Sequence, residues 1–178
     1  MDTSDSIPLE ETLEALGELV KQGKVRQIGL SNETPWGTMK YLELAETKSL
    51  PRVASIQNAY NLVNRGFEIG LSEVAMHEQV GLLAYSPLAQ GTLTGKYLGG
   101  QMPQGSRLAL FGDGPLMMRY KGDKTQQAIE MYVNLAKKYE IDPAQLAIQF
   151  CNIQPFVTST IIGATTMEQL KTCIDSVD

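Results

Sequence analysis

The chain has 178 residues, a net charge of −5 at pH 7 and 43% hydrophobic residues, which is ordinary for one soluble globular domain. Lys and Glu are mixed along its helical stretches, whereas a nucleic-acid interface needs clustered positive charge. Its apolar runs fall well short of the roughly 20 residues that cross a bilayer, and no charged-then-apolar signal segment opens the chain. We therefore expect no nucleic-acid or membrane partner and a cytoplasmic location.

The first part of the chain alternates between two periodicities. Apolar residues at helical spacing predict helices over Ser6 to Gln22, Pro35 to about Thr47, and about Gly66 to Glu78. Short, partly β-branched runs predict strands over Lys24 to Leu30, Val53 to Gln57 and Gly81 to Ser86. The strands begin about 28 residues apart and each precedes a helix, which is typical of βα units in a parallel sheet. The predicted fold class is α/β.

Between Pro87 and Gly122, glycine, proline and serine interrupt both periodicities, and we expect a long loop that is either functional or disordered. Helices are predicted again over about Asp123 to Tyr139 and from Asp142-Pro143, where a capping residue precedes a first-turn proline. A fourth strand is predicted from Thr158 to Ile162. The two cysteines, Cys151 and Cys173, fall in predicted helices without metal or disulfide spacing, so we expect two buried, reduced thiols and no metal site.

Every predicted strand ends in polar or small residues, namely Ser31-Asn32, Gln57-Asn58, Tyr85-Ser86 and Gly163. The carboxyl ends of strands build the active sites of (β/α)8 barrels, so this pattern indicates a ligand site. The alternative is that Ser, Asn and Gly simply stop strands well. No Gly-x-Gly-x-x-Gly or Walker-type loop follows a strand, and we expect neither a Rossmann nor a P-loop nucleotide site.

The start of the last predicted helix is a candidate phosphate site. Gly163 lets the backbone approach a ligand, and Thr165 and Glu168 have the spacing of a capping box. Free N–H groups and the helix dipole would favour an anion there. Lys96 and Arg107, in the glycine-rich segment, would add positive charge. The alternatives are an ordinary helix cap and solvated loop charges.

Catalytic chemistry is harder to find. The single histidine, His77, lies in a predicted helix beside Glu78, where a surface role is favoured over catalysis. No pair of carboxylates falls at strand ends, and no Ser/His/Asp set can be assembled. The residues therefore predict a binding site without an assignable catalytic group.

Four segments carry specific motifs, namely Gly23 to Asn32 (GKVRQIGLSN), Ile56 to Asn61 (IQNAYN), Leu83 to Tyr97, and Ile161 to Leu170. In this order and spacing they resemble the aldo-keto reductase family, most closely its bacterial Tas-like branch, with the potassium-channel β-subunits as more distant relatives. The resemblance covers essentially the whole chain. It implies the C-terminal half of a (β/α)8 barrel, about strands five to eight, in one N-terminally incomplete domain over residues 1–178.

The resemblance also implies an NADP(H) site. Ser31, Asn32 and Gln57 match residues that hydrogen-bond the nicotinamide carboxamide, and Tyr85 matches the aromatic residue that stacks on the ring. The loop over the pyrophosphate is matched by Ser86, Leu88, Gln90 and Lys96. The group around the adenosine 2′-phosphate and adenine is matched by Arg107, Thr165 and Gln169, which implies NADP rather than NAD. Thr172-Cys173 departs from the Glu-Asn of many relatives, which puts the adenine contacts in doubt.

Members of the family draw a catalytic Asp, Tyr, Lys and His from the first four strands, and none is assigned here. We therefore expect an oxidoreductase of the type that reduces carbonyls to alcohols, present as its cofactor-binding half with little or no activity alone. A small carbonyl substrate belongs to the complete barrel. The alternative is a non-enzymatic NADP(H)-binding regulatory or interaction module. Four parallel strands leave two open edges, so self-association is also expected.

Overall fold

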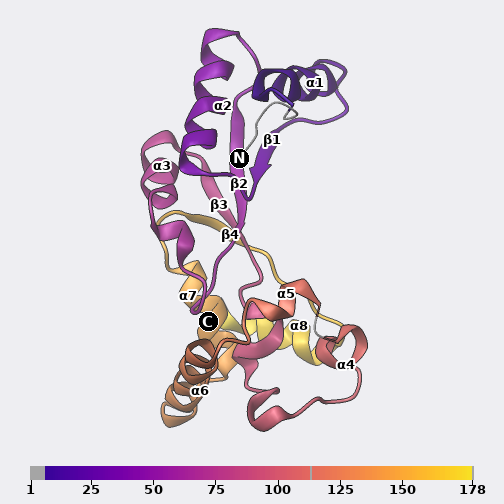
Figure 1. Ribbon diagram of the computed structural model, residues 1–178, viewed down its shortest axis with the longest axis vertical. Helices are drawn as coiled ribbons and strands as arrows, with labels where there is room; N and C mark the ends of the chain where they lie inside the picture. Colours follow the sequence, from indigo (N-terminus) through magenta and orange to yellow (C-terminus); the bar gives the residue numbers. More distant parts are fainter. Residues whose placement is uncertain (1–6, 113, 178) are drawn as a thin grey trace. The chain divides into compact units, whose positions relative to one another are not determined.

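Figure 1 shows the computed structural model, which describes residues 7–112 and 114–177. Its strands are β1 (Ile28–Ser31), β2 (Val53–Ala59), β3 (Gly81–Tyr85) and β4 (Val157–Thr160). They form a parallel four-stranded sheet in the order β1-β2-β3-β4, with helices between successive strands, which confirms the α/β class. The chain divides into two compact units, residues 1–58 with 68–83 and residues 59–67 with 84–178.

The helices of the first unit are α1 (Leu9–Lys21), α2 (Pro35–Thr47) and α3 (Leu71–Glu78). They confirm the predicted helices, although Ser6, where the first was expected to begin, lies outside the described residues. The predicted helix over 66–78 is divided into a 3₁₀ turn, η1 (Gly66–Glu68), and α3. The division falls at Gly70, whose φ of 86° no right-handed helix contains.

The predicted strand over 24–30 was wrong at its start, because β1 begins at Ile28. The backbone N–H groups of Lys24 and Val25 donate to the carbonyl of Leu19 at 3.0 and 3.5 Å. These bonds close the end of α1 and satisfy one of its orphan carbonyls. The two residues therefore belong to the exit from the helix, although their composition resembles a strand.

The core of the first unit lies where α2 contacts α1 and α3 and where the strands cover their apolar side chains. Its buried members include Leu13, Tyr41, Leu42, Ala45, Val53, Ile56, Leu71, Ala75, Val80 and Leu82.

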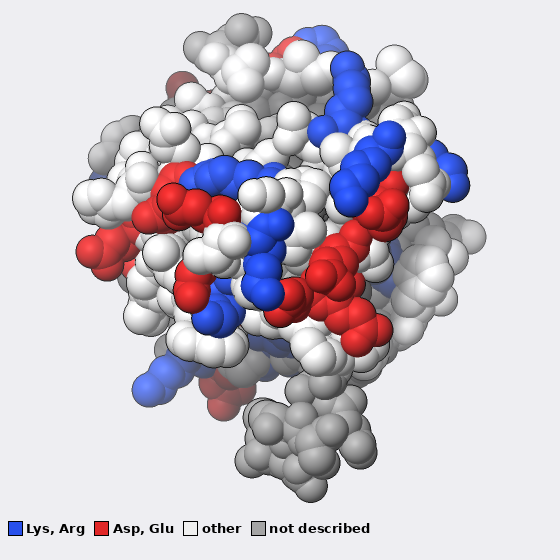
Figure 2. Space-filling model, turned by 90° about the horizontal axis from the view of Figure 1, so that it is seen from above, with Lys and Arg blue, Asp and Glu red and all other residues white. Residues whose placement is uncertain are grey.

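The exposed surface carries charges of both signs, and Figure 2 shows Lys and Arg side chains beside Asp and Glu side chains across one face. Some of these charges are paired, as in Lys21–Glu18 at 2.7 Å and Lys48–Glu10 at 3.0 Å.

In the second unit, the segment expected as a long loop contains short helices. They are η2 (Ala89–Thr94), η3 (Leu98–Gly100), α4 (Arg107–Phe111) and α5 (Pro115–Met118). Each is too short to show a helical period in the sequence. Glycines with positive φ separate them, including Gly95 at 81° and Gly105 at 73°. The prediction of an irregular loop was therefore wrong for much of this segment.

Longer helices follow, namely α6 (Asp123–Lys138), α7 (Pro143–Asn152) and α8 (Met167–Ile174), with a last 3₁₀ turn, η4 (Asp175–Val177). Asp142 caps α7 as predicted, since its carboxylate accepts from the N–H groups of Ala144 and Gln145 at 2.7 and 3.4 Å. The cap of α8 was predicted one residue too early. Thr166, not Thr165, is the N-cap, and its Oγ1 accepts from the N–H of Gln169 at 3.2 Å.

The core of the second unit combines a mainly aliphatic cluster, which includes one tyrosine, with a group of aromatic rings. The cluster consists of Ala89, Leu93, Tyr120, Ile129, Val133 and Ala147. The rings are those of Tyr60, Phe67, Phe150 and Phe156.

Cys151 in α7 and Cys173 in α8 are buried and free, as predicted. Within the described residues, no helix is both long enough and apolar enough to cross a membrane.

Candidate functional site

The side chains predicted to bind a carboxamide meet at the carboxyl ends of β1 and β2, in the first unit. Ser31 lies opposite Gln57 in the parallel register, and the backbone N–H of Asn32 donates to the carbonyl of Gln57 at 3.0 Å. The side-chain amide of Asn32 donates to Ser31 Oγ at 3.2 Å. Asn32 has a φ of 54°, a left-handed conformation that Asn tolerates better than most residues. The structure therefore groups three side chains that both donate and accept hydrogen bonds.

Asn58 follows Gln57 and adds an acceptor to this end of β2. Its side-chain Oδ1 is buried and has no hydrogen-bond partner among the described residues. Leaving a buried acceptor unsatisfied costs about 1–3 kcal/mol, so such groups are suited to accept from a ligand. The sequence placed Asn58 at a strand end but gave it no role.

In the second unit, β3 ends in a tight corner at Tyr85 and Ser86. Ser86 has a φ of 55°, and its carbonyl accepts from the N–H of Ala89 at 2.9 Å. The side-chain amide of Gln90 donates to Ser86 Oγ at 2.7 Å. Ala89 and Gln90 also have positive φ, 48° and 61°. Such strained residues cost about 1–3 kcal/mol each and cluster at ligand sites, which makes this corner a candidate binding loop.

Lys96 lies against the same loop. A Cβ added to Gly91 would be 2.9 Å from Lys96 Cε and 3.0 Å from its Nζ, so the lysine crosses the bare backbone of the glycine. The N–H of Gly91 donates to the carbonyl of Leu88 at 2.8 Å and closes the turn. The ammonium group is 5.2 Å from the centroid of the Tyr97 ring. A cation held beside a tight glycine turn is suited to a phosphate group.

Arg107 is the first residue of α4 and is exposed. A hydrogen bond joins α4 to Tyr97, the residue after Lys96: the N–H of Leu108 donates to the Tyr97 hydroxyl at 3.4 Å. The guanidinium carbon lies 6.0 Å from the centroid of the Phe111 ring. Two cations therefore belong to adjoining, hydrogen-bonded parts of one segment.

The predicted residues near α8 form a separate group. The side-chain carbonyl of Gln169 accepts from the N–H and the hydroxyl of Thr165 at 2.9 and 3.1 Å. A Cβ on Gly163 would meet nothing within 4 Å, so packing within the protein does not require a glycine there. Among the described residues, no hydrogen bond or ion pair joins Thr165 or Gln169 to Lys96 or Arg107.

The structure also shows two residues whose importance sequence reasoning missed. Asn61 and Tyr120 are almost completely buried, and a hydrogen bond of 3.2 Å joins their side chains. Asn61 was visible as part of the second motif, yet its partner is 59 positions away along the chain. Tyr120 lies between two helices in a segment without periodicity, so nothing in the sequence around it indicates such a contact.

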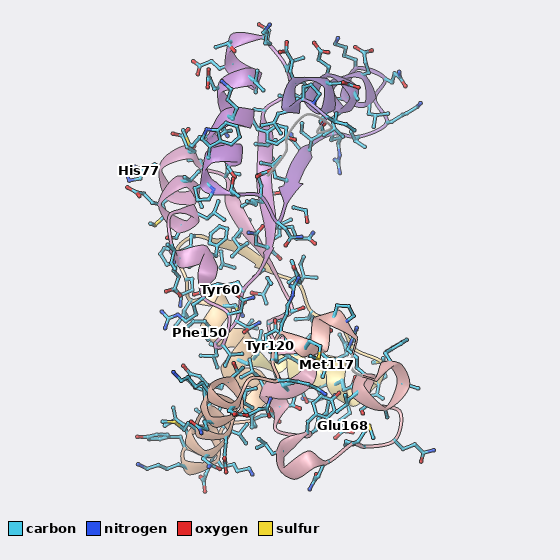
Figure 3. All side chains as sticks on the ribbon, in the orientation of Figure 1. Tyr60, His77, Met117, Tyr120, Phe150 and Glu168 are labelled. Carbon is cyan, nitrogen blue, oxygen red and sulfur yellow. The ribbon has the colours of Figure 1, made fainter. Side chains whose placement is uncertain are left out.

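Other reactive groups lie outside this site. His77 is exposed on the last turn of α3, as expected for a surface residue, and Figure 3 shows it at the outer side of that helix. Burial raises the pKa of the Cys151 thiol to about 12, which keeps it protonated and unreactive. Burial also raises the pKa of Cys173, with a smaller contribution from the charge of Asp142. In the part of the chain that the structure describes, no group of three His, Cys, Asp or Glu residues is placed to hold a metal ion.

Comparison with protein families identifies the fold's relatives. The profile described as "Aldo/keto reductase family" matches residues 2–178. The chain belongs to the aldo/keto reductase family. This membership agrees with a parallel sheet whose strands alternate with helices, as in part of an aldo/keto reductase barrel.

Among curated aldo/keto reductase relatives, "Protein tas" of Escherichia coli K12 is 53% identical over 175 residues, which cover 98% of this chain and 50% of that protein. The L-glyceraldehyde 3-phosphate reductase of the same organism is 35% identical over 94% of this chain and 49% of its own length. A probable voltage-gated potassium channel subunit beta of Arabidopsis thaliana is 32% identical over 97% of this chain and 53% of that protein. The chain therefore spans about half the length of these relatives.

Proposed function

We propose that this chain binds NADP(H) through residues at and just beyond the carboxyl ends of its strands, and that it forms the cofactor-binding, C-terminal half of an oxidoreductase barrel that reduces carbonyls to alcohols. The observation that carries the proposal is the group formed by Ser31, Asn32 and Gln57. A carboxamide has one acceptor and two donor hydrogens, and Ser31, Asn32 and Gln57 all carry side-chain donors and acceptors. The Asn32 amide lies 3.2 Å from Ser31 Oγ, and Gln57 lies opposite Ser31 in the strand register.

Each of the two units, taken by itself, offers groups that suit one part of a nicotinamide dinucleotide. Asn58 Oδ1 is a buried acceptor beside Gln57 that a donor would satisfy. The strained corner at Ser86, with Lys96 lying across Gly91, suits a pyrophosphate, because bare backbone and a cation favour an anion. Arg107 supplies a planar, always charged group of the kind that binds phosphates bidentately. This last residue supports NADP(H) over NAD(H).

The adenine end is the least supported part of the proposal. Gln169 and Thr165 satisfy each other, so a ligand would have to compete with hydrogen bonds of 2.9 and 3.1 Å. Both residues are exposed, and exchanging such bonds for bonds to a ligand costs little. We propose that they contact the adenosine portion together with the backbone around Gly163, between β4 and α8.

When bound, the cofactor would supply a hydride. The residues of this chain would orient the nicotinamide and hold its phosphates, and none of them is assigned the proton that carbonyl reduction also needs. General-acid catalysis contributes about 10²–10⁴-fold. We therefore propose that the 178-residue chain reduces carbonyls poorly or not at all, and that its own measurable property is cofactor binding.

The proposal is tested by fluorescence titration of the purified chain with NADPH, followed through cofactor emission and quenching of Trp36 and the tyrosines, with NADH as the comparison. We expect saturable binding that is tighter for NADPH. Absence of saturation at millimolar concentrations of either cofactor would contradict the proposal. An assay with 4-nitrobenzaldehyde then tests the second part, since robust turnover by this chain would show that the acid is present.

The second candidate is a non-enzymatic NADP(H)-binding module that regulates a partner. It is favoured by the 32% identity to a probable potassium channel β subunit. Reduction of a carbonyl by a chain that includes the remaining half of the family's length would decide against it. Absence of turnover together with tight NADPH binding would support it.

We also propose that the chain self-associates through its outer strands. In the sheet order, β1 and β4 each have one neighbour, so one edge of each presents open N–H and C=O groups. Light scattering at micromolar concentration should show a mass above that of one chain. A monodisperse monomer would contradict self-association without bearing on cofactor binding.

A further inference from the structure

The buried amide of Asn61 holds the corner that ends β3. Its Nδ2 donates to the backbone carbonyl of Ser86 at 2.9 Å and to the Tyr120 hydroxyl at 3.2 Å. Its Oδ1 accepts from the N–H of Val63 at 3.0 Å. Figure 3 labels Tyr120 in the second unit, to which all four of these residues belong.

The orientation of the amide follows from its partners. A carbonyl oxygen faces Nδ2 and an N–H faces Oδ1, so a flipped amide would oppose donor to donor and acceptor to acceptor. Asn61 is 0% exposed and Tyr120 2% exposed. In such surroundings each lost hydrogen bond leaves a buried polar group unsatisfied, which makes this arrangement rigid and specific.

The backbone of Asn61 is fixed as well. Its N–H donates to the carbonyl of Asn64 at 3.1 Å, and the N–H of Asn64 donates back at 3.0 Å. Just before it in the chain, the N–H of Tyr60 donates to the carbonyl of Tyr85 at 3.2 Å. Two consecutive residues after β2, Tyr60 and Asn61, therefore hold the last residue of β3 and the residue that follows it, first by backbone and then by side chain.

Ser86 needs such support because of its conformation. A serine at φ 55° is in strained, left-handed backbone, and the neighbouring Ala89 and Gln90 are strained in the same sense. The Ser86 carbonyl accepts both the Asn61 amide and the Ala89 N–H, so the amide acts on the bond that closes the turn. Without the hydrogen bond from Asn61, the backbone at Ser86 would be freer to leave its strained left-handed conformation.

We propose that the Asn61 amide, held by the Tyr120 hydroxyl, is a positioning group for the nicotinamide end of the cofactor site. It fixes the left-handed Ser86 and thereby sets how Tyr85 presents its ring. The inference rests on the proposed function, because Tyr85 is assigned to the nicotinamide there. Asn61 and Tyr120 touch neither cofactor nor substrate in this role and act only through the corner.

The first arm of the test examines the free protein. Amide hydrogen exchange by NMR reports the Ala89 N–H, which donates to Ser86. In Tyr120→Phe, which keeps the ring and removes the hydroxyl, we expect this amide to exchange about fivefold faster, and in Asn61→Asp about tenfold or more. Tyr132→Phe is the matched control, because it removes a hydroxyl from a half-buried tyrosine packed against the same cluster. Unchanged exchange in both variants would overturn the inference.

The second arm compares two ligands. NADPH reaches the corner through its nicotinamide, whereas adenosine 2′-monophosphate carries the 2′-phosphate and has neither nicotinamide nor pyrophosphate. In Tyr120→Phe we expect the Kd for NADPH to rise about fivefold and that for adenosine 2′-monophosphate to stay within about twofold. A merely structural defect would weaken both ligands equally, and that result, or no change for either, would overturn the positioning role.

The outcomes separate the two proposals. If the wild-type chain fails to bind NADPH, the proposed function is wrong and the positioning role falls with it. If the wild-type chain binds NADPH and Tyr120→Phe binds it equally well, only the positioning role is wrong. Asn61→Asp places a carboxylate at a fully buried position and is expected to destabilise the fold, so Tyr120→Phe, which removes a single oxygen atom, carries the decision.

Discussion

The ring of Tyr60 stacks on the ring of Phe150 with centroids 5.5 Å apart and an angle of 19° between the planes. Phe156 meets the same tyrosine edge-on at 5.4 Å. Tyr60 is fully buried, and Figure 3 shows it beside Phe150 in the second unit. Tyr60 directly precedes Asn61, whose amide donates to the Ser86 carbonyl. The packing of these rings therefore supports the corner at Ser86 as well as the core.

We expect Tyr60→Leu and Phe150→Leu each to lower the free energy of unfolding by about 1–3 kcal/mol. Because the rings contact each other, the double variant should lose about 1 kcal/mol less than the sum of the single losses. Urea denaturation of the four proteins measures this coupling. Phe111→Leu is the control, since that ring is 71% exposed and its loss should change the free energy by less than about 0.5 kcal/mol. Strict additivity would show that the stack contributes nothing beyond burial.

Arg107 tests the cofactor preference. Arg107→Gln removes a charge that we assign to the 2′-phosphate, and a charge-assisted hydrogen bond contributes about 1.5–3 kcal/mol. The Kd for NADPH should therefore rise about tenfold or more, while the Kd for NADH stays nearly constant. Arg119→Gln, which removes another exposed arginine of the same unit, should leave both unchanged. Equal losses for NADPH and NADH would place Arg107 away from the 2′-phosphate.

Gly91 separates backbone strain from the position of Lys96. Gly91→Ala introduces a Cβ at φ 92° that would lie 2.9 Å from Lys96 Cε, and the flexible lysine can move away. Gly99→Ala introduces one at φ 67° with nothing within 4 Å. Both should cost about 1–2 kcal/mol of stability, because an L-residue is placed in left-handed backbone. Only Gly91→Ala should also weaken NADPH binding, by several-fold in titrations. Similar affinities in the two variants would show that the position of Lys96 does not matter.

Cys151 predicts a dependence of stability on pH. Burial raises the pKa of its thiol from an ordinary 9.0 to about 12. Between these values the unfolded chain has lost the proton and the folded chain has kept it, so the free energy of unfolding falls as pH rises. Wild type should lose up to about 1.4 kcal/mol per pH unit more than Cys151→Ala above about pH 9. Urea denaturation at about pH 8 and pH 10 measures the two slopes, and parallel slopes would contradict a buried, protonated thiol.

The order of elements could be predicted from the sequence, because each long helix and each strand carries its own periodicity. The predicted bounds of α2 are those of the structure, and the Asp142 cap of α7 is in place. The predictions failed where local composition is ambiguous. Lys24 and Val25 look like a strand yet complete the end of α1, and two adjacent threonines precede α8, of which Thr166 is the cap.

The candidate site was partly predictable for the same reason. Ser31, Asn32 and Gln57 could be expected together, since parallel strands in register bring their carboxyl ends side by side. The hydrogen bonds between Thr165 and Gln169, with which a ligand would have to compete, could not be predicted. They depend on side-chain rotamers, which the sequence does not specify. Binding of NADP(H) by these residues stays a prediction, which the titration tests.

The sequence by itself determined the class of fold, the βα order, the motifs and the family, because these depend on residue types and on spacings along the chain. Only the tertiary structure decided that Asn61 joins Ser86 to Tyr120, that Lys96 crosses Gly91, and that the buried Oδ1 of Asn58 has no hydrogen-bond partner among the described residues. Hydrogen-bond geometry depends on atoms brought within about 3 Å by packing, and contacts between residues distant in the chain leave no periodic trace in the sequence.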